Sequence, residues 1–218
     1  MNPWNRRRGA IAVIPAVCAL ALAVPASAAP RGTPRPGVTI VDVRSGGSGC
    51  PENSAEVVYA TDRSAFQVGY RRPFTVTSDA VGVPVEASCS LVITIDIPTG
   101  WALTGQKLAF YALYTMGTQS WVRGRITASY RDANGVPQTM RVPVEATAPN
   151  TGGQLTAFYE MGHRPSICGG RTVMHVEQSL TAMLGRDSDR DQAKTWMVSG
   201  SHDTDSQPAS LYTSLTEC

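Results

Sequence analysis

Apolar side chains recur at every second position along much of this chain, and this alternation restricts the fold more than any other feature of the sequence. In residues 90–97 the apolar side chains share one face of an extended chain and the polar ones share the other, with Val92 as the exception. Residues 138–146 repeat the pattern. Because successive side chains of a strand point to opposite faces, such segments are typical of half-buried β-strands.

The same criteria predict about ten short strands separated by turns. We expect Lys107–Met116 to pair with Ser120–Arg131, and the Asn134-Gly135 turn to join the latter to Gln138–Ala146 as a hairpin. Pro143 has no N–H to donate, so its strand is predicted at a sheet edge or a bulge. The other strands are expected at Val38–Val43, Ala55–Ala60, Ala65–Tyr70, Ser90–Ile97, Leu155–Glu160, Thr172–Met183, Ala193–Ser199 and Ser210–Thr216.

No segment keeps the i, i+3, i+4 apolar spacing of a helix over three turns. Many short strands with little helix predict an all-β fold, an antiparallel β-sandwich. The 218 residues, 42% hydrophobic and 17% charged, suit one globular domain. We expect this single sandwich domain to span residues 50–218, with a Pro-, Gly- and Ser-rich leader at 29–49 that holds one short strand.

The first 28 residues have the three parts of a secretory signal peptide in order. Arg6, Arg7 and Arg8 precede the apolar run Ala10–Val24, and small residues up to Ala28 predict cleavage before Ala29. The run of about 15 residues is shorter than the roughly 20 that a membrane-spanning helix needs. We therefore expect a soluble, secreted product. The general and the twin-arginine export routes both remain open.

Removal of this segment changes the charge balance of the chain. The formal net charge of +2 comes from 19 basic and 17 acidic residues, and three of the basic ones are the arginines of the signal. The mature chain then has 16 basic residues against 17 acidic ones, a net charge of −1. Nucleic-acid binding normally requires a basic excess, and we set it aside.

Four cysteines remain after cleavage, and an even number in an exported chain predicts two disulfides. Cys18 would leave with the signal. Four cysteines allow three pairings, of which we favour the sequential one, and the pairings of Cys50 with Cys168 or Cys218 remain open. The wide spacing of the cysteines does not match the close pairs of a zinc site. The four are Cys50, Cys89, Cys168 and Cys218.

Short motifs follow one another along the chain: Gly49-Cys50-Pro51, Cys89-Ser90-Leu91 leading to Pro98-Thr99-Gly100-Trp101, Gly117-Thr118-Gln119-Ser120, Ser166-Ile167-Cys168-Gly169 and the last cysteine, Cys218. In this order they are similar to the secreted bacterial and fungal proteins grouped as domain of unknown function 4360. The resemblance covers nearly all of residues 49–218 and implies export, a sandwich and disulfides, but no catalytic residues. The Asp-rich stretch near Asp187 and the residue Gly170 depart from the family pattern.

No sequence motif of a hydrolase or of a metal site is complete. A triad of Ser166 with His163 and Glu160 has no pattern that favours it. The convergence of His163, Glu160 and Asp96 in one cleft would favour an enzyme, and their dispersal would favour a binding module. Asp187, Asp189 and Asp191 have the spacing of calcium ligands, but the glycine and the glutamate of a calcium loop are missing after them. We expect no catalytic residues, no metal and no cofactor.

Three side chains with binding chemistry share one face of a single predicted strand. Trp121, Arg123 and Arg125 alternate with apolar residues, which places an indole and two guanidinium groups on the polar side. An indole can stack on a sugar ring, and arginine binds carboxylate or phosphate in a bidentate manner. The opposing interpretation is that Trp121 lies under a loop and the arginines only solvate the sheet.

These observations favour a non-catalytic binding or interaction module of the cell exterior. Its expected partner is a cell-envelope polymer or a glycan, and acidic glycans suit the arginines better than neutral cellulose does. A secreted hydrolase that acts on polysaccharide or peptide is the alternative.

Overall fold

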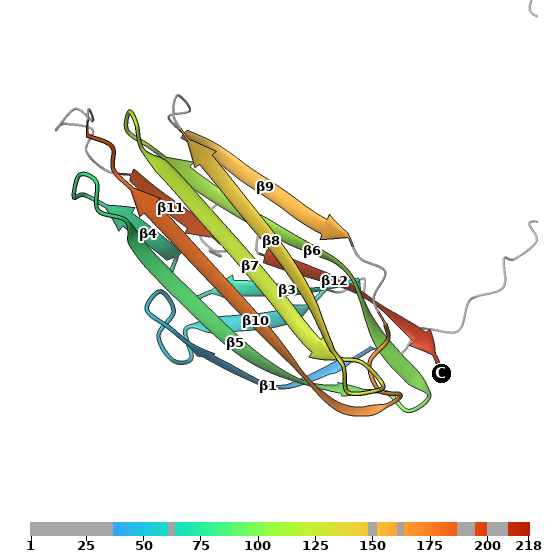
Figure 1. Cartoon of the computed structure of the whole chain (residues 1–218). Coiled ribbons are helices and arrows are strands. Elements are labelled where there is room, and N and C mark those ends of the chain that lie inside the picture. The colour runs from blue at the N-terminus through green and yellow to red at the C-terminus, as the bar shows by residue number, and fades with distance from the viewer. Residues whose placement is uncertain (1–36, 61–63, 148–151, 161–163, 187–194, 200–208) are drawn as a thin grey trace, which may run out of the picture. The chain divides into compact units, whose positions relative to one another are not determined.

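The computed structural model describes residues 37–60, 64–147, 152–160, 164–186, 195–199 and 209–218, and for 195–199 the backbone alone. The predicted signal peptide (1–28), His163 and the Asp-rich stretch at 187–191 lie outside the described residues. The described part of the chain contains strands and no helix (Figure 1). It has no helix long and apolar enough to span a membrane. The prediction of an all-β antiparallel fold is confirmed.

The strands form two antiparallel sheets. The first, in front in Figure 1, has the order β1-β5-β10-β7-β8, so most of its neighbours are far apart in the sequence. Its long strands alternate buried and exposed side chains, as the period-two pattern predicted. Its strands are β1 (Thr39–Gly46), β5 (Val85–Ile97), β7 (Trp121–Arg131), β8 (Pro137–Thr147) and β10 (Gly170–Met183).

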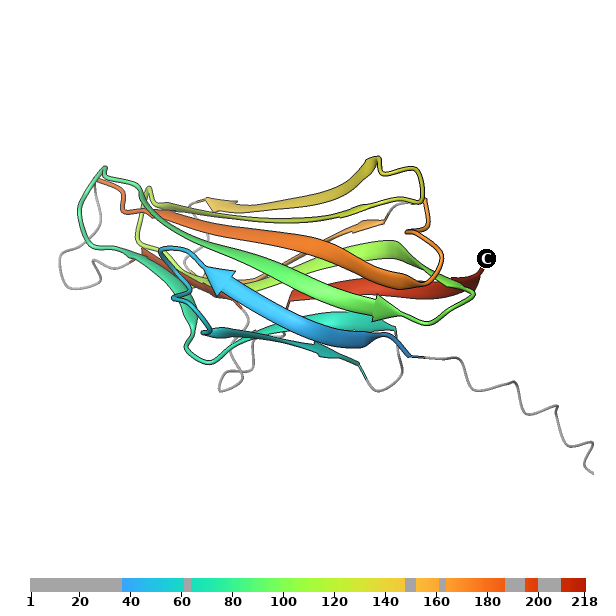
Figure 2. The ribbon, with the colours of Figure 1, turned by 90° about the horizontal axis from the view of Figure 1, so that it is seen from below.

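The second sheet lies behind the first (Figures 1 and 2) and has the order β2-β3-β12-β6-β11-β4, with β9 paired to β6. Both β12 and β11 pair with the long strand β6, at different parts of its length. Its strands are β2 (Ala55–Tyr59), β3 (Ala65–Tyr70), β4 (Phe74–Ser78), β6 (Trp101–Thr115), β9 (Gly152–Glu160), β11 (Thr195–Ser199) and β12 (Ala209–Glu217).

One hydrophobic core is shared by the two sheets. The first sheet contributes the inward residues of β5, β7, β8 and β10, such as Leu91 and Ile126, which are at most 1% exposed. The second contributes large side chains such as Phe66 and Phe110, which are buried to the same degree. The apolar faces that the alternation predicted are therefore the faces on which the two sheets pack.

The predicted pairing of Lys107–Met116 with Ser120–Arg131 is wrong. These segments become β6 and β7, which lie in different sheets: β7 pairs with β8 and β10, and β6 with β9, β11 and β12. Sequence proximity and a turn at Gly117 suggested a hairpin, but the connection crosses from one sheet to the other. The strand β4 was not predicted, because it is only five residues long and follows Pro73.

The predicted hairpin between β7 and β8 is confirmed, but its turn differs in detail. Of the Asn134-Gly135 pair, Gly135 alone has a positive φ, 77°. The turn is held by the buried carboxylate of Asp132, whose Oδ1 accepts hydrogen bonds from the backbone N–H groups of Asn134 and Val136, both at 2.9 Å. Pro143 lies on β8, at the edge of its sheet, as its missing N–H required.

Residues that we expected in the leader form an ordered edge of the sandwich. The strand expected at Val38–Val43 extends over Thr39–Gly46 and pairs with β5. The glycines that follow it make a close turn, in which the N–H of Gly49 donates to the carbonyl of Ser88 at 2.9 Å. A Cβ on Gly49 would lie 2.1 Å from the ring of Phe74, so the absence of a side chain there is a packing requirement.

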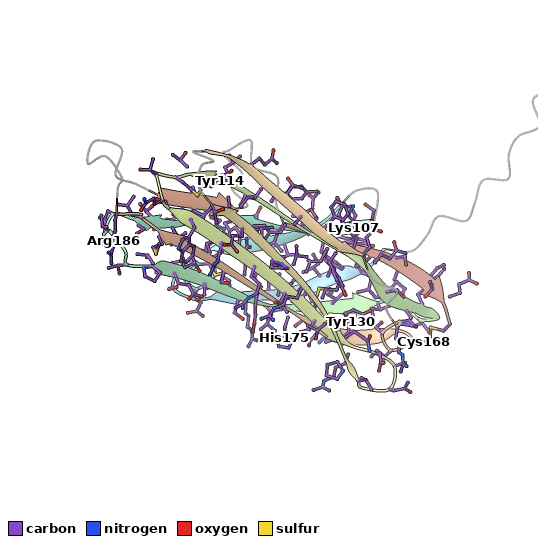
Figure 3. The ribbon with its side chains drawn as sticks, turned by 45° about the horizontal axis from the view of Figure 1, so that its top comes forward. Lys107, Tyr114, Tyr130, Cys168, His175 and Arg186 are labelled. Carbon is purple, nitrogen blue, oxygen red and sulfur yellow. A yellow bond between two sulfur atoms is a disulfide. The ribbon has the colours of Figure 1, made fainter. Side chains whose placement is uncertain are left out.

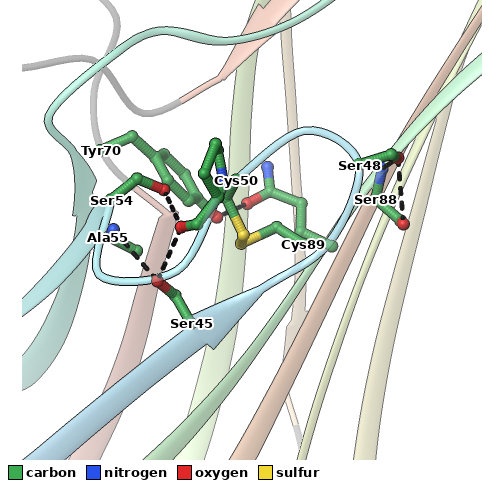
Figure 4. Close-up of a disulfide and its surroundings, with 10 residues drawn as sticks. Ser45, Ser48, Cys50, Ser54, Ala55, Tyr70, Ser88 and Cys89 are labelled. Carbon is green, nitrogen blue, oxygen red and sulfur yellow. Dashed lines mark hydrogen bonds between the residues drawn. A yellow bond between two sulfur atoms is a disulfide. The ribbon is translucent and has the colours of Figure 1, made fainter.

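The two disulfides join Cys50 to Cys89 and Cys168 to Cys218, which is the sequential pairing. Figure 4 shows the first of them between the turn after β1 and strand β5, next to Tyr70. Cys50 and Cys89 are 1% and 2% exposed, whereas Cys168 and Cys218 lie on the surface. The two bonds therefore differ in their access to solvent.

We expect mild reduction to open the Cys168–Cys218 bond well before the Cys50–Cys89 bond. A thiolate must reach a sulfur atom to attack it, and burial denies that access in the folded chain. Alkylation at increasing dithiothreitol concentration, followed by peptide mapping, measures the order. Equal labelling of all four cysteines while the protein remains folded would contradict the prediction.

Candidate functional site

The outward side of the five-stranded sheet, called here the β7 face, carries the three residues predicted from the sequence. The inward residues of β7 are buried, which turns Trp121, Arg123 and Arg125 to the outside, as the alternation predicted. Trp121 is half-buried, and the two arginines are exposed. The register places Arg123 between Thr181 of β10 and Glu145 of β8, and Arg125 between Ser179 and Pro143.

Arg123 is held in place from two sides. Its guanidinium carbon lies 4.4 Å from the centroid of the Trp121 ring, within the range of a cation–π contact. Its Nη2 also donates a hydrogen bond of 3.0 Å to Oε1 of Glu145. Arg123 thus covers one face of the indole, and its charge is balanced by Glu145. Glu145 has no sequence signal of its own beyond its place on the polar side of β8.

Arg125 differs from Arg123 because it has no ion pair or hydrogen-bond partner among the described residues. It lies at the junction of two adjoining hollows of about 520 and 300 Å³ in the β7 face, which share Glu86, Arg125 and Ser179. We call this region the Arg125 hollow. Its floor carries the small side chains of Ser179 and Thr181. The further charged groups on its rim are Arg123, Glu145 and Glu177.

The Arg125 hollow is close to electrical balance. Arg123 and Glu145 neutralise one another, and Arg125 stands near the carboxylates of Glu86 and Glu177, which lie across the same hollow. It therefore presents hydrogen-bond donors, hydrogen-bond acceptors and hydroxyl groups together. Such a set matches the hydroxyl groups of a sugar better than it matches a strongly charged ligand.

A third hollow, of about 750 Å³, lies at the other end of β7 and was not predicted from the sequence. We call it the Arg131 hollow. It is lined by Arg131, Arg171 and His175, with Ile167 and Val173 as apolar surface. The two apolar side chains are each 39% exposed. Figure 3 shows His175 on the outside of the sheet at this end of the sandwich.

A group of aromatic residues lies on the outward side of the other sheet and was also missed. The Nζ atom of Lys107 lies 4.0 Å from the centroid of the Phe158 ring and 5.6 Å from that of Tyr212. Phe158 is 59% exposed. Figure 3 labels Lys107 on the opposite side of the molecule from His175. The sequence signal was present in the alternation of β9, but Phe158 and Tyr159 are adjacent, which obscures the period of two.

The residues named for a hydrolase do not converge in the described part of the chain. Asp96 lies on β5 and Glu160 on β9, in different sheets. The hydrogen bond from Arg171, at 2.9 Å, lowers the pKa of Asp96 below its usual value, and Glu160 lies 3.9 Å from Lys107. Ser166 is 1% exposed, and its hydroxyl accepts from the N–H of Leu103 and donates to the carbonyl of Ile167. Its role is structural.

The described residues include no group of three or more histidine, cysteine or acidic side chains that could hold a metal ion. The acidic stretch near Asp187 is not among them. Trp101, which could have lined a groove, packs against the core instead.

An all-β, disulfide-linked sandwich with a hollowed polar face is the class that this fold defines. The model of the domain of unknown function DUF4360 matches residues 36–218, and the chain belongs to this family. No curated protein matches it.

Two solved structures are similar over a large part of the chain. TmCBM61, in complex with β-1,4-galactotriose, is 14% identical over 81% of this chain and 88% of that chain, with a TM-score of 0.34. The enzymatically active domain of tailspike protein 4 of bacteriophage CBA120 is 12% identical over 74% of this chain and 19% of that chain, with a TM-score of 0.19. Both likenesses are too remote to indicate a ligand.

Proposed function

We propose that this protein is an exported glycan-binding module, and that it binds its ligand on the β7 face at the Arg125 hollow. The observation that carries the proposal is the guanidinium of Arg125, which has no partner among the described residues and lies between two hollows lined by carboxylates and hydroxyls. In this view the signal peptide is cleaved before Ala29, and the mature domain works at the cell exterior.

The groups that converge at Arg125 suit a sugar. A sugar hydroxyl both donates and accepts, and it can bridge an arginine and a carboxylate such as Glu86. Ser179 and Thr181 are small enough to leave the floor open, and their hydroxyl groups can bind as well. The hollow of about 520 Å³ lies within the usual range of small-ligand sites.

Arg123, which packs on the indole of Trp121, forms the wall at one end of this site. The cation–π contact and the bond to Glu145 fix the Arg123 guanidinium before a ligand arrives, which lowers the entropy cost of binding. The indole face that Arg123 does not cover is the one that can stack on a sugar ring. The three predicted residues thus have different roles. Arg125 binds the sugar, Arg123 limits its position at the wall, and Trp121 holds Arg123 and can stack on a sugar ring.

We expect Arg125→Gln to weaken glycan binding by about tenfold or more, because hydrogen bonds to a charged group are among the strongest in a binding site. The measurement is the retardation of the purified mature domain in native gels that contain polygalacturonate, teichoic acid or hydroxyethylcellulose. These polymers separate carboxylate, phosphate and neutral ligands. Arg72→Gln is the matched control, because Arg72 is exposed in the turn between β3 and β4, on the other sheet.

Trp121→Ala tests the wall. Lost retardation with an unchanged melting temperature supports its role in binding, whereas lost stability with unchanged retardation assigns Trp121 to packing alone. Failure of all three polymers, and of crude cell-envelope material, to retard the wild-type domain would refute the proposed function.

A further inference from the structure

Strand β7 carries binding groups at both ends of its outward side. Arg123 and Arg125 stand at one end, Arg131 at the other, and the outward positions between them hold the small side chains of Thr127 and Ser129. Six residues separate Arg125 from Arg131, which places their Cα atoms about 20 Å apart along the strand. The Arg125 and Arg131 hollows thus lie on one face, in line along one strand.

The two hollows differ in charge. Among the described residues, the one carboxylate that lines the Arg131 hollow belongs to Asp132, which is 1% exposed. Its oxygens already accept bonds from the N–H groups of Asn134 and Val136 and from Nε2 of Gln138. The accessible polar groups of this hollow therefore include the guanidinium groups of Arg131 and Arg171, of which Asp96 balances the second, and the imidazole of His175.

Both guanidinium groups are held by the protein and retain free donors. Nη1 of Arg131 donates to the carbonyl of Gly135 at 2.7 Å. Nε and Nη2 of Arg171 donate to the two carboxylate oxygens of Asp96 at 2.9 and 3.2 Å. A guanidinium has five N–H donors, so Arg131 keeps four of them and Arg171 keeps three. A positioned donor set of this kind fits a carboxylate.

Apolar surface accompanies the cationic groups. Val173 lies on β10 two residues from His175, and Ile167 approaches from the loop before β10. A uronic acid residue has both features that such a hollow would recognise, a carboxylate and an apolar ring face. A free inorganic anion would use the donors and leave the apolar surface exposed.

From these observations we propose that the ligand is an extended acidic polysaccharide that lies along β7, with one acidic sugar residue in the Arg131 hollow and another part of the same chain in the Arg125 hollow. This inference rests on the proposed function. A span of about 20 Å exceeds one sugar ring and requires an oligosaccharide of about four residues or more. The hydroxyl groups of Thr127 and Ser129 would contact the sugar residues between the two hollows.

The test is calorimetric titration of the mature domain with oligogalacturonides of one to eight residues. We expect the affinity to rise by at least tenfold between two and about five residues and then to level off, because the second hollow binds an already tethered chain. Neutral oligosaccharides of the same lengths should show no such rise, because they cannot use the cationic hollow.

Single variants show which hollow provides the rise in affinity with length. Arg131→Gln and, independently, His175→Ala should weaken binding of the short and the long acidic oligomers, because both use the cationic hollow. Arg125→Gln should reduce the affinity for the long oligomers toward that for the short ones. Arg72→Gln is the control for a lost surface charge. The use of His175→Ala, at an exposed position, keeps the test valid should Arg131→Gln disturb the β7–β8 turn.

The outcomes separate the two proposals. Binding that does not depend on length, or that Arg131→Gln and His175→Ala leave unchanged at every length, would overturn the inference and leave the proposed function intact. Equal affinity for neutral and acidic oligomers of five residues would overturn it as well. No binding of any oligomer or of the polymers above would overturn both.

Discussion

Replacing Cys50 and Cys89 together with alanine is expected to lower the free energy of unfolding by about 4 kcal/mol, a large part of the stability of a typical domain. The bond closes a separation of 39 residues, and its loss restores the freedom of that loop in the unfolded chain. It also joins the turn after β1 to the long strand β5, where both cysteines are buried. Urea denaturation followed by fluorescence measures the change.

The second disulfide provides the matched control. Cys168 and Cys218 are 50 residues apart, so loop entropy predicts a similar loss for their replacement, but their exposed sulfur atoms contribute less packing. We therefore expect the buried pair to cost at least as much as the exposed pair. A loss below about 1 kcal/mol for the buried pair would contradict the loop-entropy account.

Tyr70→Phe is expected to lower the free energy of unfolding by about 1 to 3 kcal/mol, although it removes a single oxygen atom. The hydroxyl of Tyr70, on β3, donates a hydrogen bond of 2.6 Å to Oε1 of Gln178, on β10. The two side chains are 1% and 2% exposed, and this bond joins the two sheets through the core. Without it, the buried side chain of Gln178 loses the hydrogen bond from Tyr70.

The double variant Tyr70→Phe with Gln178→Leu is the control. Each single variant removes the bond that the two side chains share, so we expect the double variant to lose less than the sum of the two single losses. If the two single losses simply add, Tyr70 and Gln178 do not stabilise the protein through a shared bond.

The same residue gives an alkaline signature. Burial raises the pKa of the Tyr70 hydroxyl far above its usual value, so this group contributes stability below about pH 10 and that contribution is lost as the pH rises further. Tyr70→Phe should therefore reduce the loss of stability between pH 9 and about pH 11, measured by denaturant titration at each pH.

The sequence was sufficient for most of the local elements, though not for β4 or for the first residues of β5, and for the direction in which their side chains point. The alternation of β5, β7 and β8 identified their buried faces, and it placed Trp121, Arg123 and Arg125 together on the outside. Period-two geometry is a local property of an extended chain, so it can be read from one segment at a time.

Strand partners could not be read in the same way. The neighbours of β7 are β8, which is local, and β10, which begins 39 residues after the end of β7. The assignment of β6 and β7 to opposite sheets depends on how the apolar faces meet, and no single segment records that. The Arg131 hollow was missed for the same reason, because it combines β7, β10 and the loop that holds Ile167.

The pairing of Glu145 with Arg123 also came from the register of neighbouring strands. This pairing changes the interpretation of the site. Two arginines on one strand suggested a cationic patch, but in the structure Glu145 balances the charge of Arg123. The free carboxylate of Glu86 beside Arg125 reduces the charge further. The preference for acidic ligands thus moves from the predicted residues to the opposite end of β7.

The position of β12 has a consequence for the order of events during synthesis. This strand comes from residues 209–217, yet it lies between β3 and β6, inside the second sheet. A ribosome that has completed residues 1–208 has released strands β3 and β6 with a gap between them. Pairing across such long sequence separations is slow compared with local folding. The chain therefore stays without its complete second sheet until strand β12 emerges.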